Sequence, residues 1–189
     1  MKNENLGPAI KEFFEFLGLI FADTSKLLTV IEEYMKKENF VSFYGATSVW
    51  DRSWAYYGFY GWLPHYLCRI YVPKEGSGKK PNTRDKIFQF VNIYFMPENV
   101  LEPVVVFGIT KLIREEFDNS WSTLMLLNSG PNFINSERVE SWETFDGDAE
   151  SAIEVIHYKE IPLVEFKDQL TAESMCKELV SKLRERKVK

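Results

Sequence analysis

The chain has 189 residues, a mass of 22.2 kDa and a formal net charge of −5, with 45% hydrophobic and 27% charged residues. This length fits one hydrophobic core, and the composition excludes a disordered chain, a collagen and a small disulfide-rich scaffold. The acidic balance disfavours duplex nucleic acid as a partner, because a surface that contacts many phosphates needs a surplus of positive charge. We expect a single domain over 1–189, with a helical segment (1–38), a β-rich core (40–165) and a C-terminal helix (171–187).

The first 38 residues show helical periodicity. One apolar stripe is formed by Ile10, Phe13, Phe14, Leu17 and Phe21, and we expect this stripe to face the core. Asp23 or Thr24 is a suitable N-cap for a second helix. That helix has its own apolar face, made of Leu27, Leu28, Ile31, Tyr34 and Met35. The pattern predicts a pair of helices that meets at Asp23, either as a hairpin or as one kinked element.

From Phe40 onward the periodicity changes to that of strands. Segments rich in β-branched and aromatic residues cover Phe40–Val49, Tyr66–Val72, Lys86–Met96, Val104–Ile113 and Ala152–Leu163. Both alternating sets of Lys86–Met96 are largely apolar, which predicts a central strand covered on both faces. The short connection Pro97–Pro103 favours an antiparallel pair. Ser120–Leu127 fits a strand or a helix, and we expect a strand because eight residues are too few to show a helical period.

The rest of the chain supplies turns and a last helix. Pro73–Arg84 is polar and rich in Gly and Pro, which predicts a long loop, and Asn128–Asn132 predicts a turn. Thr171–Arg186 predicts a helix capped by Thr171, with an inward face of Met175, Leu179, Val180 and Leu183. We therefore predict an α+β fold, in which a mainly antiparallel sheet of about five to six strands carries an N-terminal helix pair and a C-terminal helix packed on it.

An aromatic block is the most unusual feature of the sequence. Ten aromatic residues lie within residues 43–66, and residues 41–84 carry six basic and two acidic side chains in an otherwise acidic protein. Tyr and Trp suit surfaces that are apolar at one end and wet at the other, and a nearby Arg adds a planar cation. We expect a ligand or partner to contact Trp50, Arg52, Trp54, Tyr57, Tyr60, Trp62 and His65. The alternative is that these rings fill the core.

A second candidate site consists of acidic residues and a lysine. Asp148 precedes the triplet Glu165-Phe-Lys167 by 17 residues, a layout found in metal-dependent nucleases, where carboxylates hold the ion. Acid-x-Lys triplets also arise by chance in a chain so rich in charged residues. A small metal-dependent hydrolase that uses Asp148, Glu165 and Lys167 is thus an alternative to the binding module.

The remaining signals concern cysteines, targeting and partners. Cys68 and Cys176 are isolated, which predicts a reducing, cytoplasmic setting and neither a zinc site nor a disulfide framework. Glu12 and Glu15 interrupt the apolar N-terminal run, and the uncharged stretch Ser53–Cys68 is too short and too rich in Gly and Pro to span a membrane. We expect a soluble module without a cofactor. Its partner is a protein, a small ring-containing ligand or a second copy that meets the aromatic block.

Overall fold

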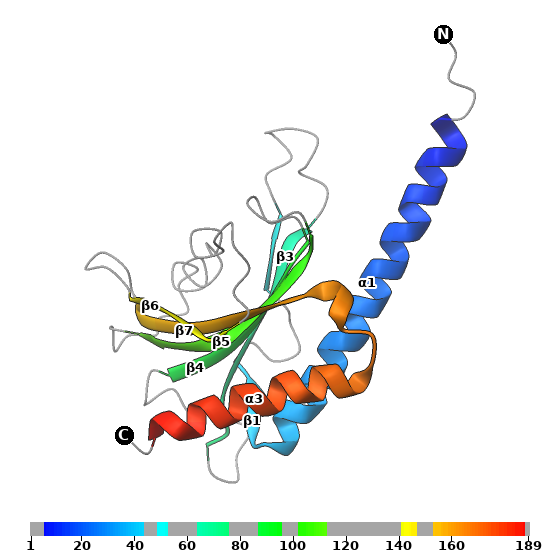
Figure 1. The fold of residues 1–189 in the computed structure, drawn as a ribbon. Helices are drawn as coiled ribbons and strands as arrows, with labels where there is room; N and C mark the ends of the chain where they lie inside the picture. Colours follow the sequence, from blue (N-terminus) through cyan, green and yellow to red (C-terminus); the bar gives the residue numbers. More distant parts are fainter. Residues whose placement is uncertain are drawn as a thin grey trace.

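The structure is a computed structural model, and it describes residues 6–43, 49–52, 64–75, 87–95, 102–112, 141–146 and 153–187. Two helices pack on one face of an antiparallel sheet (Figure 1). The α+β class and the mainly antiparallel sheet agree with the sequence prediction. The predicted strand Ser120–Leu127 and the turn Asn128–Asn132 lie outside the described residues.

The N-terminal helix α1 (Leu6–Lys37) is continuous over 32 residues. The predicted helix pair is therefore one element, and Asp23 does not interrupt it. The Asp23 carboxylate accepts a hydrogen bond of 2.9 Å from Lys26 Nζ one turn later, and Thr24 is buried within the apolar stripe. The helix ends where Asn39 takes a left-handed conformation, with φ of 65°, which Asn tolerates better than most residues.

The described sheet runs in the order β1-β3-β4-β5-β7-β6, and all its pairs are antiparallel. Its central strands are β3 (Pro64–Pro73), β4 (Ile87–Tyr94), β5 (Val104–Leu112) and β7 (Ile153–Pro162). At one edge, β1 (Phe40–Ser42) and β2 (Val49–Arg52) pair with opposite ends of β3. The other edge is β6 (Glu143–Asp146), a short exposed strand that the sequence analysis missed.

Side-chain alternation gives the sheet two apolar faces. One face packs under the helices through Tyr71, Val91, Val105, Phe107 and Ile109, which share a buried cluster with α1 residues. The other face holds a second buried cluster around Ile70, Phe90, Val106, Ile156 and Tyr158. Strand β4 is buried at nearly every position, as the two apolar sets of Lys86–Met96 predicted.

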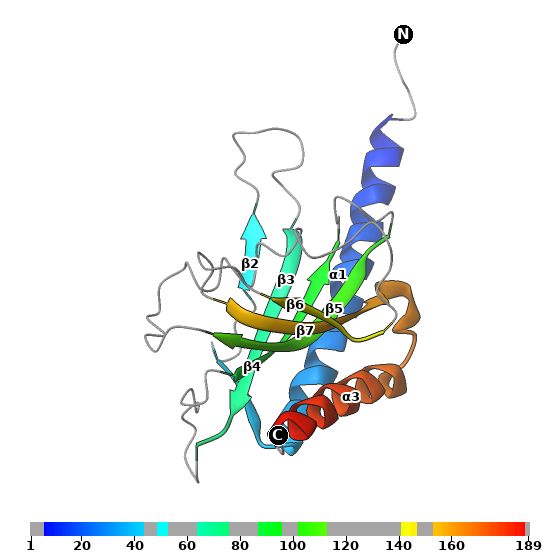
Figure 2. The same cartoon turned by 60° about the vertical axis from the view of Figure 1, so that its left-hand side comes forward.

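The chain closes through the 3-10 turn η4 (Leu163–Glu165) and helix α3 (Gln169–Lys187), which lies across the lower part of α1 (Figure 2). The predicted inward face of α3 is confirmed, because Met175, Leu179, Val180 and Leu183 are all buried. Its cap, however, is Asp168 and not Thr171. The Asp168 carboxylate accepts hydrogen bonds from both the backbone N–H and the hydroxyl of Thr171.

Candidate interaction surface

Five large apolar side chains are exposed around the first half of α1. The exposed fractions are 47% for Ile10, 50% for Phe13, 58% for Phe14, 60% for Phe16 and 65% for Leu19. We call these five residues the α1 patch. The sequence prediction that Ile10, Phe13 and Phe14 face the core is thus wrong for this half of the helix, where only Leu17, Ile20 and Phe21 are half-buried.

The geometry of α1 explains this exposure. Figures 1 and 2 show the first half of α1 extending beyond the described strands, so none of these strands lies under it. Contact with the body begins at Phe21, whose ring meets Phe95 edge-on at 5.5 Å, and continues through Thr24, Leu28 and Ile31, which are buried. The same apolar stripe is therefore core in one half of the helix and surface in the other.

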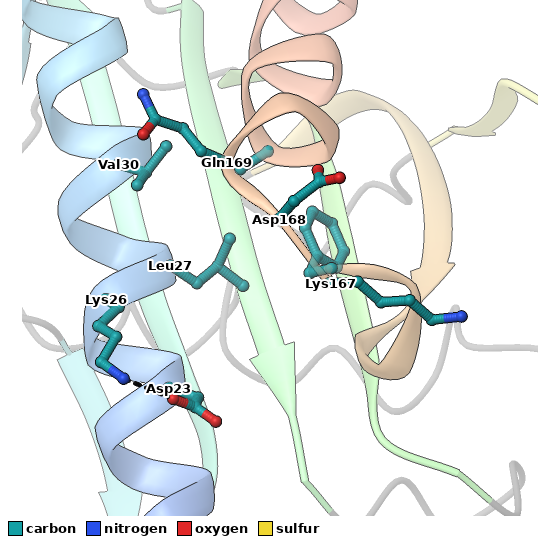
Figure 3. A pocket seen from close by; sticks show the side chains of 9 residues that line it. Asp23, Lys26, Leu27, Val30, Lys167, Asp168 and Gln169 are labelled. Atoms are coloured by element: carbon teal, nitrogen blue, oxygen red, sulfur yellow. Dashed lines mark hydrogen bonds and ion pairs between the residues drawn. The ribbon is translucent and has the colours of Figure 1, made fainter.

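An open cleft of about 480 Å³ continues this surface along α1. It lies between α1 and the turn that leads into α3 (Figure 3). Its apolar lining comes from Leu27, Val30, Phe166 and Ala172. Two exposed apolar side chains flank this turn: Val164 in η4 and Leu170 in the first turn of α3, with exposed fractions of 63% and 73%.

The polar groups that line the cleft contact one another or point outward. Lys26 pairs with Asp23 along α1, and Asp168 caps α3 (Figure 3). The hydrogen bonds from Thr171 hold the pKa of Asp168 below its ordinary value, so this carboxylate is charged at neutral pH. Lys167 extends away from α1 in the same view. The cleft thus offers an apolar floor with a charged rim.

Ion pairs beneath the helices hold the layers together. Arg69 of β3 lies 3.5 Å from Glu32 of α1, and both side chains are largely buried. Glu178 of α3 accepts hydrogen bonds from Lys159 at 3.0 Å and from Trp142 Nε1 at 2.7 Å. These pairs fix α1 and α3 on the sheet, and we assign them a structural role.

Polar groups also lie inside the sheet, on the face away from the helices. Asn92 donates a hydrogen bond of 3.2 Å to the hydroxyl of Tyr94, and Glu160 of β7 is 2% exposed. Burial raises the pKa of Tyr158 to about 12, with further contributions from the negative charges of Glu143 and Glu160. At neutral pH the Tyr158 hydroxyl is therefore protonated and can donate, as it does toward Glu143 at 3.5 Å.

The structure places only part of the aromatic block. Trp50 and Arg52 lie in β2 and His65 lies in β3; the backbone pairs Trp50 with Leu67 and Arg52 with Pro64. The two ends of the block therefore meet at the sheet edge that β1 and β2 form. The side chains of these three residues, and all of Trp54, Tyr57, Tyr60 and Trp62, are outside what the structure describes.

The hydrolase candidate is also placed only in part. Glu165 ends η4, Lys167 follows two residues later, and both side chains are exposed, while Asp148 lies outside the described residues. Within the part of the chain that the structure describes, no group of three or more His, Cys, Asp or Glu side chains could hold a metal ion.

The thiols and the described histidine are engaged in the fold. Cys68 and Cys176 are completely buried, and burial raises the pKa of each thiol to about 12, so neither forms a thiolate near neutral pH. His157 of β7 shares a hydrogen bond of 2.8 Å with the hydroxyl of Thr144 on β6. This cross-strand pair agrees with a structural role for His157.

Sequence reasoning missed the α1 patch although it identified the stripe. A core-facing stripe and a partner-facing stripe have the same periodicity, so the pattern does not distinguish them. One usable signal was the density of apolar residues from Ile10 to Ala22, which exceeds what a single buried face requires. Phe16 and Leu19 lie outside the predicted stripe and mark this excess.

Comparisons with protein-family models, with curated proteins and with solved structures gave no match. Neither α1 nor α3, as far as the structure describes them, is long and apolar enough to cross a membrane.

Proposed function

We propose that this protein is a binding module that works by contacting another protein, not by catalysing a reaction. The observation that carries the proposal is the α1 patch, in which five large apolar side chains on one helix are each about half exposed or more. Ile10, Phe13 and Phe14 lie on one side of α1 and together expose roughly 300 Å² of apolar surface, since one aromatic side chain can bury roughly 150–250 Å². Contiguous apolar patches of a few hundred Å² on a monomer often mark interaction sites.

The aromatic block is a second contact surface in this proposal. Its candidate contacts are Trp50, Arg52, Trp54, Tyr57, Tyr60, Trp62 and His65, and residues 41–84 around them carry more basic than acidic side chains. The pairing of β2 with β3 keeps the two ends of the block together at a sheet edge. A partner protein with an acidic rim suits this surface, and a small ring-containing ligand is the alternative occupant.

The first test asks whether the α1 patch is surface or core in solution. At a protein concentration of about 1 μM, Phe13→Ser should change the free energy of unfolding by less than about 0.5 kcal/mol, because an exposed ring contributes little to the core. Leu28→Ala, on the sheet-facing part of the same helix, should cost about 2–5 kcal/mol. Urea denaturation measures both. A large loss with Phe13→Ser would show that the patch is part of the core and would remove the proposal.

The second test asks whether the patch meets a partner in cells. A photo-crosslinking phenylalanine analogue replaces Phe16, and the same analogue at Glu33, an exposed polar position of α1, is the matched control. We expect discrete crosslinked products of constant mass from position 16 and none from position 33. Absence of products at position 16 in every growth condition that expresses the protein, or equal products at both positions, would contradict the proposal.

A further inference from the structure

We propose that the cleft between α1 and the turn into α3 is a binding site for a neutral, mainly apolar small molecule. Its volume of about 480 Å³ lies within the range of roughly 300–1,000 Å³ that is typical of small-molecule pockets. Its lining side chains come from α1, from the turn after η4 and from the first turn of α3 (Figure 3). The site is distinct from the α1 patch and from the aromatic block, so the proposal goes beyond the proposed function and does not depend on it.

The floor of the cleft is a preformed apolar surface. Leu27 and Ala172 are 8% and 1% exposed and belong to the buried cluster under the helices, and Val30 and Phe166 pack against that cluster. Because the core holds these side chains in place, the floor exists before a ligand binds. At about 30 Å³ per molecule, the cleft holds roughly 16 water molecules, and those at the floor face side chains that offer no hydrogen bond. An apolar ligand displaces this water, which favours binding.

The charged groups around the cleft favour a neutral ligand. Lys26 Nζ pairs with the Asp23 carboxylate at 2.9 Å. Asp168 accepts hydrogen bonds from Thr171 and occupies the positive end of the α3 dipole, where an anionic ligand would otherwise bind. Lys167 extends away from α1 (Figure 3). The two lysines and two aspartates of the lining balance in charge, and a charged ligand would lose its hydration at the apolar floor without gaining a partner there.

The rim of the cleft favours a small molecule over a protein. The side chains of Lys26 and Asp23 are 76% and 74% exposed, so water solvates this ion pair. A specific protein interface covers roughly 800 Å² on each side, so a protein partner would also cover this pair and Asp168 and remove their water, which is unfavourable for charged groups. A ligand of two or three rings reaches the floor between these side chains and leaves the rim in water.

A neutral fluorescent probe, N-phenyl-1-naphthylamine, tests the site. It has three rings and becomes brighter in apolar surroundings. Wild-type protein titrated into a dilute solution of the probe should bind it with a dissociation constant on the order of 100 μM, as expected for a ligand of this size. Val30→Phe should weaken binding by roughly tenfold or more, since the new ring takes the space that the ligand would fill. Thr29→Phe adds the same ring at an exposed position of α1 outside the cleft lining and should bind like the wild type.

Two further variants locate the bound probe. Gln169→Phe fills the cleft from α3 at an exposed position, so it should weaken binding even if Val30→Phe fails to fold. Phe13→Ser with Phe14→Ser removes apolar surface from the α1 patch and should leave probe binding unchanged. The proposal is overturned if the wild-type protein shows no saturable binding up to about 500 μM, five times the expected dissociation constant. It is also overturned if the folded cleft-filling variants bind like the wild type, or if Thr29→Phe or the Phe13→Ser/Phe14→Ser protein loses binding equally.

A charged analogue tests the class of ligand. The probe 8-anilino-1-naphthalenesulfonate has the same three rings and an added sulfonate. The binding that Val30→Phe removes should be weaker for this anion than for the neutral probe by roughly tenfold or more, because the sulfonate must give up its hydration. Equal or tighter binding of the anion in the cleft would overturn the assignment of a neutral ligand.

A crosslinking experiment distinguishes a small molecule from a protein in the cleft. A photo-crosslinking phenylalanine analogue at Gln169 should give no discrete product with another protein in cells. Such a product would show that the cleft belongs to a protein interface and would overturn a small molecule as its occupant. The proposed function is tested separately by the analogue at Phe16 in the α1 patch, so either proposal can fail without the other.

Discussion

At the scale of single residues, Gly108 occupies the most restrictive position described in the sheet. It lies in β5 between Phe90 of β4 and Tyr158 of β7 in the strand register. A Cβ atom at this position would collide with the backbone oxygen of His157 and would come within 2.8 Å of the tip of the Phe90 ring. Glycine is required there because the backbone oxygen of His157 in β7 and the Phe90 ring of β4 both lie close to the backbone of β5, not because the backbone is strained.

This geometry predicts opposite effects for two Gly→Ala changes. Gly108→Ala should lower the free energy of unfolding by about 1–3 kcal/mol, because the backbone and the Phe90 ring must move to make room. Gly18→Ala has open space around the new methyl group and should raise stability by about 0.5–1 kcal/mol, because Gly is unfavourable inside a helix. Urea denaturation of both variants measures the difference. Equal effects would show that the close approach at Gly108 is absent in solution.

At the scale of elements, the start of α3 depends on a single carboxylate. Asp168 satisfies the backbone N–H of Thr171 in the first turn, where no backbone acceptor exists. Its charge also lies at the positive end of the helix dipole. The hydrogen bonds from the backbone N–H and the hydroxyl of Thr171 favour the ionised form, which is why the pKa of Asp168 falls below its ordinary value.

The direction of this shift fixes a pH dependence. A carboxyl with a lowered pKa in the folded state stabilises the protein above its unfolded pKa, and this contribution disappears as the pH falls through the folded pKa. Asp168→Asn still caps the helix but does not titrate. The stability advantage of the wild type over Asp168→Asn should therefore be present at pH 7 and should shrink below about pH 4. Thermal unfolding of both proteins from pH 7 to pH 2.5 measures this difference in stability. A difference that stays constant with pH would contradict the charged capping role of Asp168.

Helix α1 shows how one element serves two environments. Its apolar stripe is continuous from Ile10 to Met35, yet Ile31 and Met35 are fully buried while Ile10 and Phe14 are about half exposed. The periodicity comes from the helix itself, whereas the exposure depends on where the sheet ends. The same element therefore contributes to the core and presents the α1 patch.

At the scale of the whole molecule, the two helices and one face of the sheet share a buried core. A single buried cluster contains α1 residues such as Ile31, α3 residues such as Leu179 and strand residues such as Val105 and Phe107. Trp142 links these layers as well, because its ring meets Phe107 edge-on at 5.5 Å and its Nε1 donates to Glu178. Loss of one layer should therefore remove the other.

A change in α3 tests this cooperativity. Leu179→Ala should lower the free energy of unfolding by about 2–5 kcal/mol, because it opens a cavity between α3 and the sheet. Far-UV and near-UV circular dichroism should report one shared transition, since helix and sheet lose their packing together. The control Leu170→Ala alters a side chain on the same helix that is 73% exposed and should have a small effect. Two separated transitions for Leu179→Ala would contradict a single core.

Much of the fold could be predicted from local chemistry. The apolar residues on both sides of Lys86–Met96 predicted a central strand, and β4 is buried at nearly every position. The spacing of apolar residues in the last helix predicted its inward face, and those residues are buried. Strand β6 was missed because Glu143–Asp146 is short, exposed and half acidic, so it lacks the apolar alternation that marks a strand. The cap at Asp168 was missed because Thr171, three residues later, also has a side chain that can cap a helix.

The candidate site was harder to predict for a physical reason. The aromatic block was selected by composition, and composition does not determine which rings contact water; its main residues stay a prediction. The α1 patch became visible only when the end of the sheet was located relative to the helix. Phe13 in α1 and Phe90 in β4 are the same kind of residue, and only the tertiary packing around each one makes Phe90 buried and Phe13 half exposed.

The sequence by itself determined both helical segments, the strands β3, β4, β5 and β7 and the apolar side of α3, because these properties depend on spacing and side-chain chemistry within a few residues. It missed β6, and it joined β1 and β2 into one predicted strand, Phe40–Val49. Only the tertiary structure decided that α1 is continuous through Asp23, that β1 and β2 share one edge of β3, and that half of an apolar stripe faces solvent. Those outcomes depend on contacts between segments far apart in the chain, such as Phe21 with Phe95, and local spacing carries no information about them.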